Sequence, residues 1–442
     1  MKVRRPRRRG AFGFFIAATL WSAMTYSQEA PSPQTPWPQP LTLEYVLTQV
    51  DETHPDLELA SAAVAQAQAL QLDAQSRYGL NASLVGQLRW VDPPDIAPDQ
   101  SQGDHRVSLY LRQRLYDFGR TAAADAAAEA ALTGSEARYR FALNQYRLAV
   151  MAAFFDVLLA DLEYARDDED MATAYVQYDR ARQRNRLGQV SDIDLAELET
   201  AYQSSRARRY ASDTRRRTSR AALASILNRP EQLPSELATP ALATLGRDIP
   251  DVEPWFQTAE ADNTLLSALR EEVETARRLL AEAEAGGNPV LNGEVEISRY
   301  AREAGGYDNW RAGVTLDVPL STGGATKAQT ARRRAELQTA QARLEKQRLA
   351  VRQAVVEAWG ELGDLKAKRD EMASLSAYRD LYLDRSRALY EQEVKTDLGD
   401  AMVRTSDARL KVAQTEFRIA LTWARVQALL GQTVSVTKEN SK

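Results

Sequence analysis

The chain has 442 residues, with 57 basic and 61 acidic side chains, no cysteine and only two histidines. The lack of cysteine excludes disulfides, thiol nucleophiles and lipid attachment to an N-terminal cysteine. Two histidines leave little for acid–base catalysis or a transition-metal site. We therefore expect a protein that is not an enzyme and holds no cofactor or metal.

The N-terminus has the pattern of a secretory signal peptide. Six basic residues lie within residues 2–9, an apolar stretch covers 11–24, and a candidate cleavage site follows at 25–27. Removing residues 1–27 leaves 51 basic against 61 acidic residues, a net charge of -10, which argues against nucleic acid as a partner. After residue 30, no stretch approaches the ~20 apolar residues of a membrane-spanning helix. We expect export without a retained membrane anchor.

Residues 28–41 contain five prolines and should be extended. The first structural repeat then covers residues 42–228. Its predicted elements are a helical segment at 42–79 interrupted near His54-Pro55, strands at 81–92 and 106–116, a long helix at 120–187 and a returning helix at 192–227. Gly188 lies where a left-handed helix end is expected, and Ser191 with Asp194 has the spacing of a helix start.

The same order of elements returns after a proline-rich connector at 229–261. The second repeat covers residues 262–430, with a helix at 262–284, strands at 290–300 and 310–320, a long helix at 325–390 and a helix at 397–430, and a polar tail follows at 431–442. Gly119 corresponds to Gly323, and Arg147-Leu148-Ala149-Val150 returns as Arg348-Leu349-Ala350-Val351. A repeat of this length is a structural half rather than a short solenoid unit.

The two long helices should pack as coiled coils. A helix of ~65–70 residues is ~100 Å long at 1.5 Å per residue, so it needs neighbours along its length to bury an apolar seam. That seam contains Phe141, Leu148, Met151, Phe155, Leu158 and Leu162 in the first repeat, and Leu349, Val356, Trp359 and Leu362 in the second. A mainly α-helical bundle is therefore expected.

The four strands are long and have two different faces. Apolar residues alternate with polar ones, as in Val107, Leu109 and Leu111 against Ser108, Tyr110 and Arg112. This pattern is typical of strands that cross an outer membrane, although a half-buried soluble sheet alternates similarly. In lipid a four-stranded sheet cannot leave open edges. Several chains would then have to share one barrel, and three chains would give twelve strands.

Taken in order, the motifs resemble the TolC-like outer-membrane efflux protein family over residues 41–430. The stretches that carry the resemblance are Leu41-Thr42-Leu43-Glu44, His54-Pro55-Asp56-Leu57, Leu115-Tyr116-Asp117-Phe118-Gly119-Arg120, Phe154-Phe155-Asp156-Val157-Leu158-Leu159-Ala160 and Leu187-Gly188-Gln189-Val190-Ser191 before Asp194-Leu195. Each stretch is short, but their order, their duplication and the signal peptide together are specific.

The resemblance implies a homotrimer. Its twelve-stranded β-barrel would lie in outer-membrane lipid and continue as an α-helical tunnel through the periplasm. The family forms passive exit ducts that dock a periplasmic adaptor protein and an inner-membrane transporter. The resemblance also implies roles for particular residues. Asp117, Phe118, Gly119, Gly323 and Gly324 would form the strand-to-helix swivels, and Leu187, Gly188, Gln189, Val190, Ser191, Val394 and Thr396 would form the tip that contacts the adaptor.

In the family, acidic residues on the second-repeat helix line the periplasmic constriction. Carried over by position, these are Asp397 and Asp400, with Tyr390 and Lys395 as candidate tethers that hold the tip closed. A ring of such carboxylates would select cations, raise some carboxylate pKa values and bind divalent cations. Alternatively, both aspartates only start a helix, where negative charge suits the helix dipole.

Alternatives remain for the role of a cluster of arginines and for the function of the protein. Seven arginines between Arg206 and Arg220 could suggest nucleic acid binding, but their helical spacing favours a charged face between helices. For function, we expect an efflux duct, with the outer-membrane component of type I protein secretion as an alternative. A non-conducting periplasmic spacer would need the coiled coil but no lipid-facing strands.

Overall fold

The structure, a computed structural model, describes residues 37–49, 54–97, 99–301, 308–392 and 397–435. The predicted signal peptide at 1–27, most of the extended segment at 28–41 and the end of the tail at 431–442 lie outside the described residues. Val394, Lys395 and Thr396 also lie outside them. Residues from Pro38 onwards form one compact unit, and the description below concerns that unit alone.

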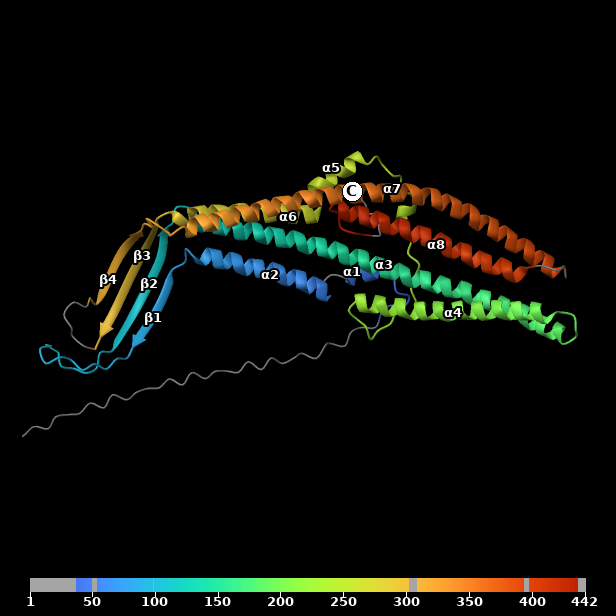
Figure 1. The fold of residues 1–442 in the computed structure, drawn as a ribbon, viewed down its shortest axis with the longest axis horizontal. Coiled ribbons are helices and arrows are strands. Elements are labelled where there is room, and N and C mark those ends of the chain that lie inside the picture. Colours follow the sequence, from blue (N-terminus) through green and yellow to red (C-terminus); the bar gives the residue numbers. More distant parts are fainter. Residues whose placement is uncertain (1–36, 50–53, 98, 302–307, 393–396, 436–442) are drawn as a thin grey trace, which may run out of the picture. The chain divides into compact units, whose positions relative to one another are not determined.

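The unit is mostly helical, with one small sheet (Figure 1). Its elements, in chain order, are α1 (Leu43–Gln49), α2 (Pro55–Ser76), β1 (Asn81–Gln87), β2 (Arg106–Tyr116), α3 (Arg120–Asn185), α4 (Asp192–Ile226), the 3-10 helix η1 (Ala243–Gly246), α5 (Glu253–Asp262), α6 (Thr264–Glu284), the 3-10 helix η2 (Ala285–Gly287), β3 (Val290–Tyr300), β4 (Trp310–Asp317), α7 (Ala325–Glu391) and α8 (Leu398–Leu429).

Several boundaries differ from the sequence prediction. The strand predicted at 81–92 ends at Gln87, because its partner strand β2 begins at Arg106, opposite Gln87. Beyond Gln87, Trp90 forms an isolated bridge to Gly103. The strand predicted at 310–320 ends at Asp317, because its partner strand β3 begins at Val290 and offers no further backbone groups.

The predicted connector at 229–261 contains η1 and α5. Pro254 lies in the first turn of α5, where the missing amide hydrogen breaks no helical hydrogen bond. Pro55 begins α2 in the same way, and His54 Nδ1 accepts a hydrogen bond from the Asp56 amide at 3.2 Å.

One buried hydrophobic cluster lies among α5, α6, α7 and α8. Helix α3 packs against α2, α4, α6 and α8, while α7 packs against α6 and α8 (Figure 1). Phe155 of α3 stacks on Phe417 of α8 with ring centroids 4.5 Å apart, and Trp255 of α5 meets the edge of Trp423 at 5.8 Å. Aromatic packing thus joins the first repeat to the second.

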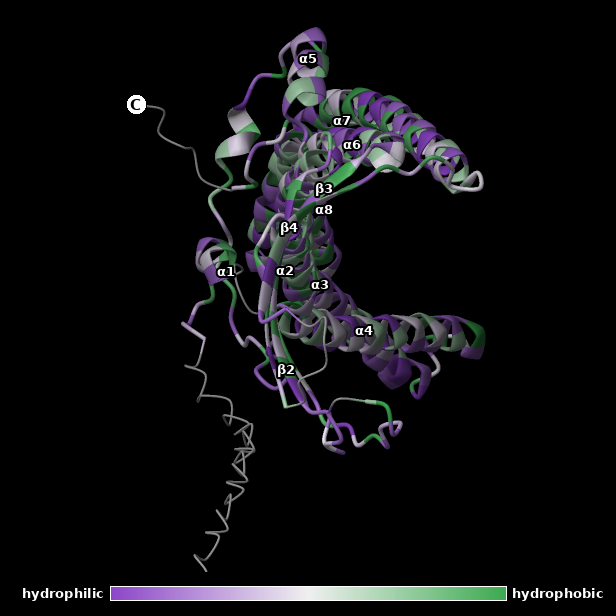
Figure 2. Cartoon of the chain, turned by 90° about the vertical axis from the view of Figure 1, so that its left-hand side faces the viewer, coloured by the Kyte–Doolittle hydropathy of each residue, from purple (hydrophilic) through white to green (hydrophobic). Residues whose placement is uncertain are grey.

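No helix in the described part of the chain has a stretch long and apolar enough to cross a membrane. Hydrophobic and hydrophilic residues are mixed along α3, α4 and α7 (Figure 2). The long helices therefore bury narrow seams rather than whole surfaces.

Arginines of α4 form an ionic ladder with α3. Arg208 donates to Asp170 at 2.6 Å, and Arg220 donates through both of its terminal nitrogens to Asp161 at 2.7 and 2.8 Å. Arg216 lies over the ring of Tyr164, 4.1 Å from its centroid. The seven arginines of the sequence thus lie on a helix that pairs with acidic residues of its neighbour.

The sheet has the strand order β1-β2-β3-β4, and every pairing is antiparallel. Leu84, Leu109, Ile297 and Trp310 form one row across all four strands. Leu84 and Trp310 in this row are 71% and 68% exposed. One face of the sheet is therefore apolar and uncovered within the chain.

The opposite face carries a polar network. Ser83, Tyr110, Glu296 and Arg311 form the adjacent row, in which Arg311 forms an ion pair with Glu296. Ser298 Oγ donates to Glu296 Oε1 at 2.9 Å and lies 2.7 Å from the Ser108 hydroxyl. Since each strand alternates faces, the polar and apolar rows are fixed together by one pairing register.

The first strand-to-helix swivel is closed by a buried carboxylate. The Asp117 side chain is fully buried and accepts hydrogen bonds from the Tyr78 hydroxyl at 2.9 Å, the Thr121 amide at 2.9 Å and the Thr121 hydroxyl. Arg114 lies 3.5 Å away. Burial alone would raise the pKa of Asp117, but these hydrogen bonds and the charge of Arg114 outweigh it and lower the pKa.

The two swivels reach the same backbone shape by different means. In the first, Phe118 and Gly119 have φ values of 54° and 90°, whereas in the second Gly323 and Gly324 have values of 59° and 89°. A positive φ costs a phenylalanine free energy but costs a glycine almost none. The hydrogen bonds of Asp117 hold the first swivel in this conformation. The second swivel, Ser321-Thr322-Gly323-Gly324, contains no carboxylate.

We predict that Asp117→Ala destabilises the protein by ~3 kcal/mol, because it leaves Tyr78, Thr121 and Arg114 without their shared acceptor. The temperature at which the helical circular-dichroism signal is lost would measure this. Since the pKa of Asp117 is lowered, its contribution should persist above the unfolded-state pKa and disappear as the pH falls through the folded-state pKa. Ser321→Ala in the second swivel is the matched control and should have little effect. Equal losses in the two variants would contradict this account.

Candidate functional site

The acidic site lies where α8 begins. Asp397 occupies the position before α8, and Asp400 lies in its first turn. Each aspartate has a partner in its own chain. The Tyr382 hydroxyl of α7 donates to Asp397 Oδ2 at 2.6 Å, and Arg404 Nε donates to Asp400 Oδ2 at 2.6 Å. One carboxylate is thus joined to the neighbouring helix, and the other to the next turn of its own helix.

These contacts favour the ionised form of Asp397. The Tyr382 hydrogen bond is the main cause that lowers the pKa of Asp397, with a backbone hydrogen bond and the charges of Arg404 and Arg385 adding to it. The same hydrogen bond raises the pKa of Tyr382, since a tyrosinate would face a carboxylate. The site is exposed, so water weakens these charge interactions. Within one chain, Asp397 therefore stays ionised at neutral and mildly acidic pH.

Tyr382 is the site residue that sequence reasoning missed. The predicted tether, Tyr390, lies in the last turn of α7 and is 60% exposed, while the second predicted tether, Lys395, lies outside the described residues. A signal for Tyr382 did exist in the repeat, because Tyr178 lies at nearly the same distance from Gly119 before α3 as Tyr382 from Gly324 before α7. Tyr178 contacts the returning helix too, stacking on Tyr202 with centroids 5.8 Å apart.

The first-repeat tip joins α3 to α4. Gly188 has a φ of 70°, and Ser191 Oγ accepts from the Asp194 amide at 3.1 Å, which caps α4. Asn185, which sequence reasoning also missed, donates to the Val190 carbonyl at 3.0 Å and to Asp192 Oδ1 at 2.9 Å. An asparagine at the end of a helix is too common to be recognised from sequence as the residue that closes this turn.

This closed turn exposes two large apolar side chains. Leu187 and Ile193 are 72% and 81% exposed. The described part of the predicted tip comprises Leu187, Gly188, Gln189, Val190 and Ser191. Val394 and Thr396 lie outside the described residues. The predicted tip thus combines a hydrogen-bonded turn with uncovered apolar surface.

Comparisons with known proteins are consistent with this arrangement. Residues 255–432 match the outer membrane efflux protein family. Protein CyaE of Bordetella pertussis is 26% identical over 269 residues, which are 60% of this chain and 57% of that protein. The proteases secretion protein PrtF of Dickeya chrysanthemi is 23% identical over 343 residues, 74% of this chain and 73% of that protein.

The fold also matches a solved structure. The Campylobacter jejuni CmeC outer membrane channel superposes with a TM-score of 0.72 at 14% identity, covering 90% of this chain and 87% of that chain. At that identity the match concerns the fold alone. The chain is therefore similar to the outer membrane efflux protein family over residues 255–432, and its fold is that of the CmeC outer membrane channel.

Proposed function

We propose that three copies of this chain form a passive duct through which small molecules leave the cell in a tripartite efflux system. The observation that carries the proposal is the four-stranded sheet with one uncovered apolar face and one polar face. Within the described residues, β1 and β4 each pair on one side only. Joining the β4 edge of one copy to the β1 edge of the next, three times, would close a twelve-stranded barrel and leave no open edge in lipid.

The dimensions of the sheet suit an outer membrane. β2 has 11 residues, which at ~3.3 Å per residue extend ~36 Å, or ~27 Å along the membrane normal at a tilt of about 40°. Exposed aromatic residues lie toward both ends, Trp90 and Trp310 near the strand-to-strand loops and Tyr116 and Phe118 next to the helices. Aromatic girdles of this kind flank the apolar band of outer-membrane barrels. The helical part would then lie in the periplasm.

The two helix turns would form the periplasmic end of the duct. Asp397 and Asp400 from three copies would place six carboxylates around the axis, which would attract cations. Neighbouring copies would oppose the lowered pKa of Asp397, because like charges disfavour ionisation. Tyr390, exposed on α7, and Lys395 remain candidates for tethers to a neighbouring copy. Leu187 and Ile193 offer apolar contacts to a periplasmic adaptor that links the duct to an inner-membrane transporter.

Conductance across a planar bilayer tests the proposal. The purified protein should form long-lived channels with a uniform conductance and elute as a trimer in detergent. A monomer that forms no channels would exclude the duct and favour a non-conducting periplasmic spacer.

Type I protein secretion remains the second candidate, because PrtF, which matches along 74% of this chain, is named for protease secretion. Deleting the gene separates the two functions. Loss of efflux would raise the sensitivity of cells to small toxic compounds, whereas loss of secretion would remove a protein from the culture medium.

We predict that Asp397→Ala with Asp400→Ala reduces the preference of the channel for cations and weakens its block by multivalent cations, because the carboxylates that attract them are lost. Reversal potentials in a salt gradient measure the first effect, and current block by a trivalent cation measures the second. Asp407→Ala, which removes one carboxylate farther along α8, is the control for the loss of negative charge away from the turn. If selectivity and block are the same in all three proteins, both aspartates only start the helix.

We predict that Tyr382→Phe makes the cation selectivity more sensitive to acid. The pKa of Asp397 is held below its usual value of 3.8 chiefly by the Tyr382 hydroxyl, so the wild-type charge is lost only as the pH falls through that lowered value. Without the hydroxyl the pKa should rise, and selectivity should be lost at a higher pH. Reversal potentials recorded from pH 7 to 3 measure the shift. Tyr378→Phe, one helical turn earlier, should titrate like wild type, and identical curves for Tyr382→Phe would reject the contact.

A further inference from the structure

A small cationic pocket lies far from both turns, between η1 and the helices α7 and α8. Its volume is about 150 Å³. Arg247, Lys366 and Arg369 line it together with apolar residues that include Leu362, Ile419 and Trp423. A pocket that combines several cations with an apolar wall suits a ligand that has an anionic end and an apolar body.

Two of the three cations, Arg247 and Arg369, are held in place, whereas Lys366 is 59% exposed, and little of the positive charge is neutralised. The Arg247 guanidinium lies over the Trp423 ring, 4.3 Å from its centroid. Arg369 donates a hydrogen bond to the Leu245 carbonyl. Lys366 lies 3.5 Å from Asp248, whose side chain is 99% exposed. Among the residues that the structure describes, neither Arg247 nor Arg369 forms an ion pair, so three positive charges meet one negative charge at the pocket.

The pocket also contains a hydroxyl that lacks a partner. Thr244 lines the pocket. Its Oγ1 atom is buried and has no hydrogen-bond partner within the described residues. A buried hydroxyl without a partner is unfavourable, and such a group calls for an explanation. An oxyanion in the pocket would accept from this hydroxyl and from the neighbouring cations together.

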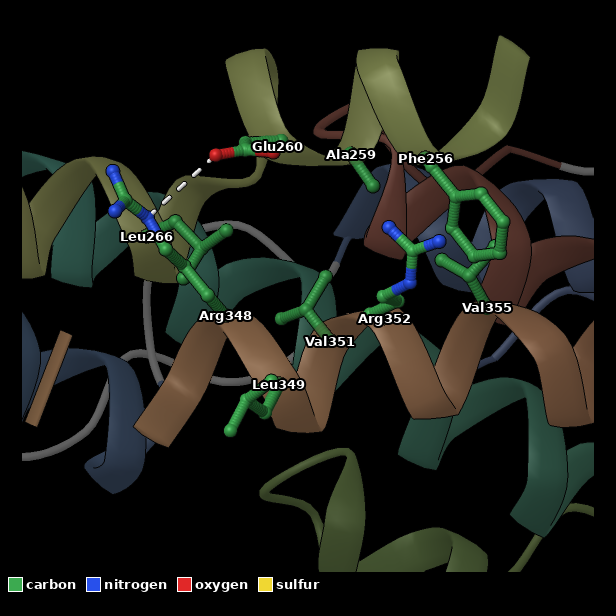
Figure 3. Close-up of a pocket in the computed structure, with 9 residues that line it drawn as sticks. All are labelled: Phe256, Ala259, Glu260, Leu266, Arg348, Leu349, Val351, Arg352 and Val355. Carbon is green, nitrogen blue, oxygen red and sulfur yellow. Dashed lines mark ion pairs between the residues drawn. The ribbon is translucent and has the colours of Figure 1, made fainter. Parts of the chain in front are cut away.

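A second pocket on α7 has a smaller excess of positive charge. In that cavity of about 180 Å³ under α5, Arg348 and Arg352 project from α7 toward Phe256 and Glu260 (Figure 3). Arg348 forms ion pairs with Glu260, 3.7 Å away, and with Glu345. Arg352 lies over the Phe256 ring, so two arginines and one carboxylate line this pocket. The pocket beside η1 differs in its larger excess of positive charge.

We propose that the pocket beside η1 binds a carboxylate group on a short apolar stem. The carboxylate would lie between Lys366, Arg369 and the Thr244 hydroxyl, and the stem would contact Ile419 and Leu362. Such a group occurs on a free organic acid or on an acidic side chain of a bound protein. The site is independent of conduction, since it lies among the helices and uses no residue of the sheet or of the turns.

Fluorine NMR of 4-fluorobenzoate, titrated with the full-length protein in detergent, tests the site. We expect saturable line broadening and a dissociation constant raised about tenfold by Lys366→Gln or Thr244→Val, which each remove one polar contact. Lys368→Gln is the matched control, because Lys368 lies two residues away on α7, is paired with Glu371, and does not line the pocket. Thr244→Val keeps the shape of the side chain, and both variants should elute like wild type.

Competition identifies the source of the carboxylate. A peptide with one internal glutamate that displaces 4-fluorobenzoate more strongly than glutarate would indicate a protein side chain, and the reverse order would indicate a free acid. Inorganic phosphate displacing the probe more strongly than either would overturn the carboxylate assignment. Broadening that does not saturate, or that Lys368→Gln weakens as much as Lys366→Gln, would overturn the site. None of these outcomes depends on whether the protein forms channels.

Discussion

Backbone hydrogen bonding is the constraint on which this architecture depends. The helices satisfy their own amides and carbonyls, but a sheet satisfies them only between strands. This chain provides four strands, and the two outer ones pair on one side only within the described residues. A sheet with one apolar face and two open edges is incomplete by itself. The proposed trimer is the arrangement that completes it, and the long helices, which leave the sheet at α3 and α7, then lie around the same axis.

Much of this fold follows from sequence because its periodic signals are long. The alternation of Arg106–Tyr116 and the helical pattern after Gly119 extend over enough residues to outweigh local exceptions. Strand ends were less predictable, because Gln87 and Asp317 end their strands where the partner strand runs out, not where their own pattern stops. The helix α5 lies within the predicted connector and is short, and its Pro254 lies in the first helical turn.

The candidate site could be predicted only in part, for a physical reason. Asp397 and Asp400 lie three residues apart at a helix start, and the resemblance to the family indicated them. Tyr382 contacts Asp397 across the turn between two helices, and such a pairing depends on how α7 and α8 pack. The sequence likewise indicated Asp117 as part of a swivel, but not its hydrogen bond with Tyr78, because Tyr78 lies 39 residues earlier in the chain.

The contact between Tyr382 and Asp397 has a consequence for how an opening between three copies would change its width. A carboxylate on a free side chain could widen an aperture by changing rotamer, within nanoseconds and without moving the backbone. Here Asp397 accepts a hydrogen bond from Tyr382 of the neighbouring helix, and Asp400 accepts one from Arg404 in the next turn of its own helix. Widening the aperture would therefore require either that these exposed contacts break or that whole helix pairs move. The second route has the timescale of collective helix motion, microseconds to milliseconds.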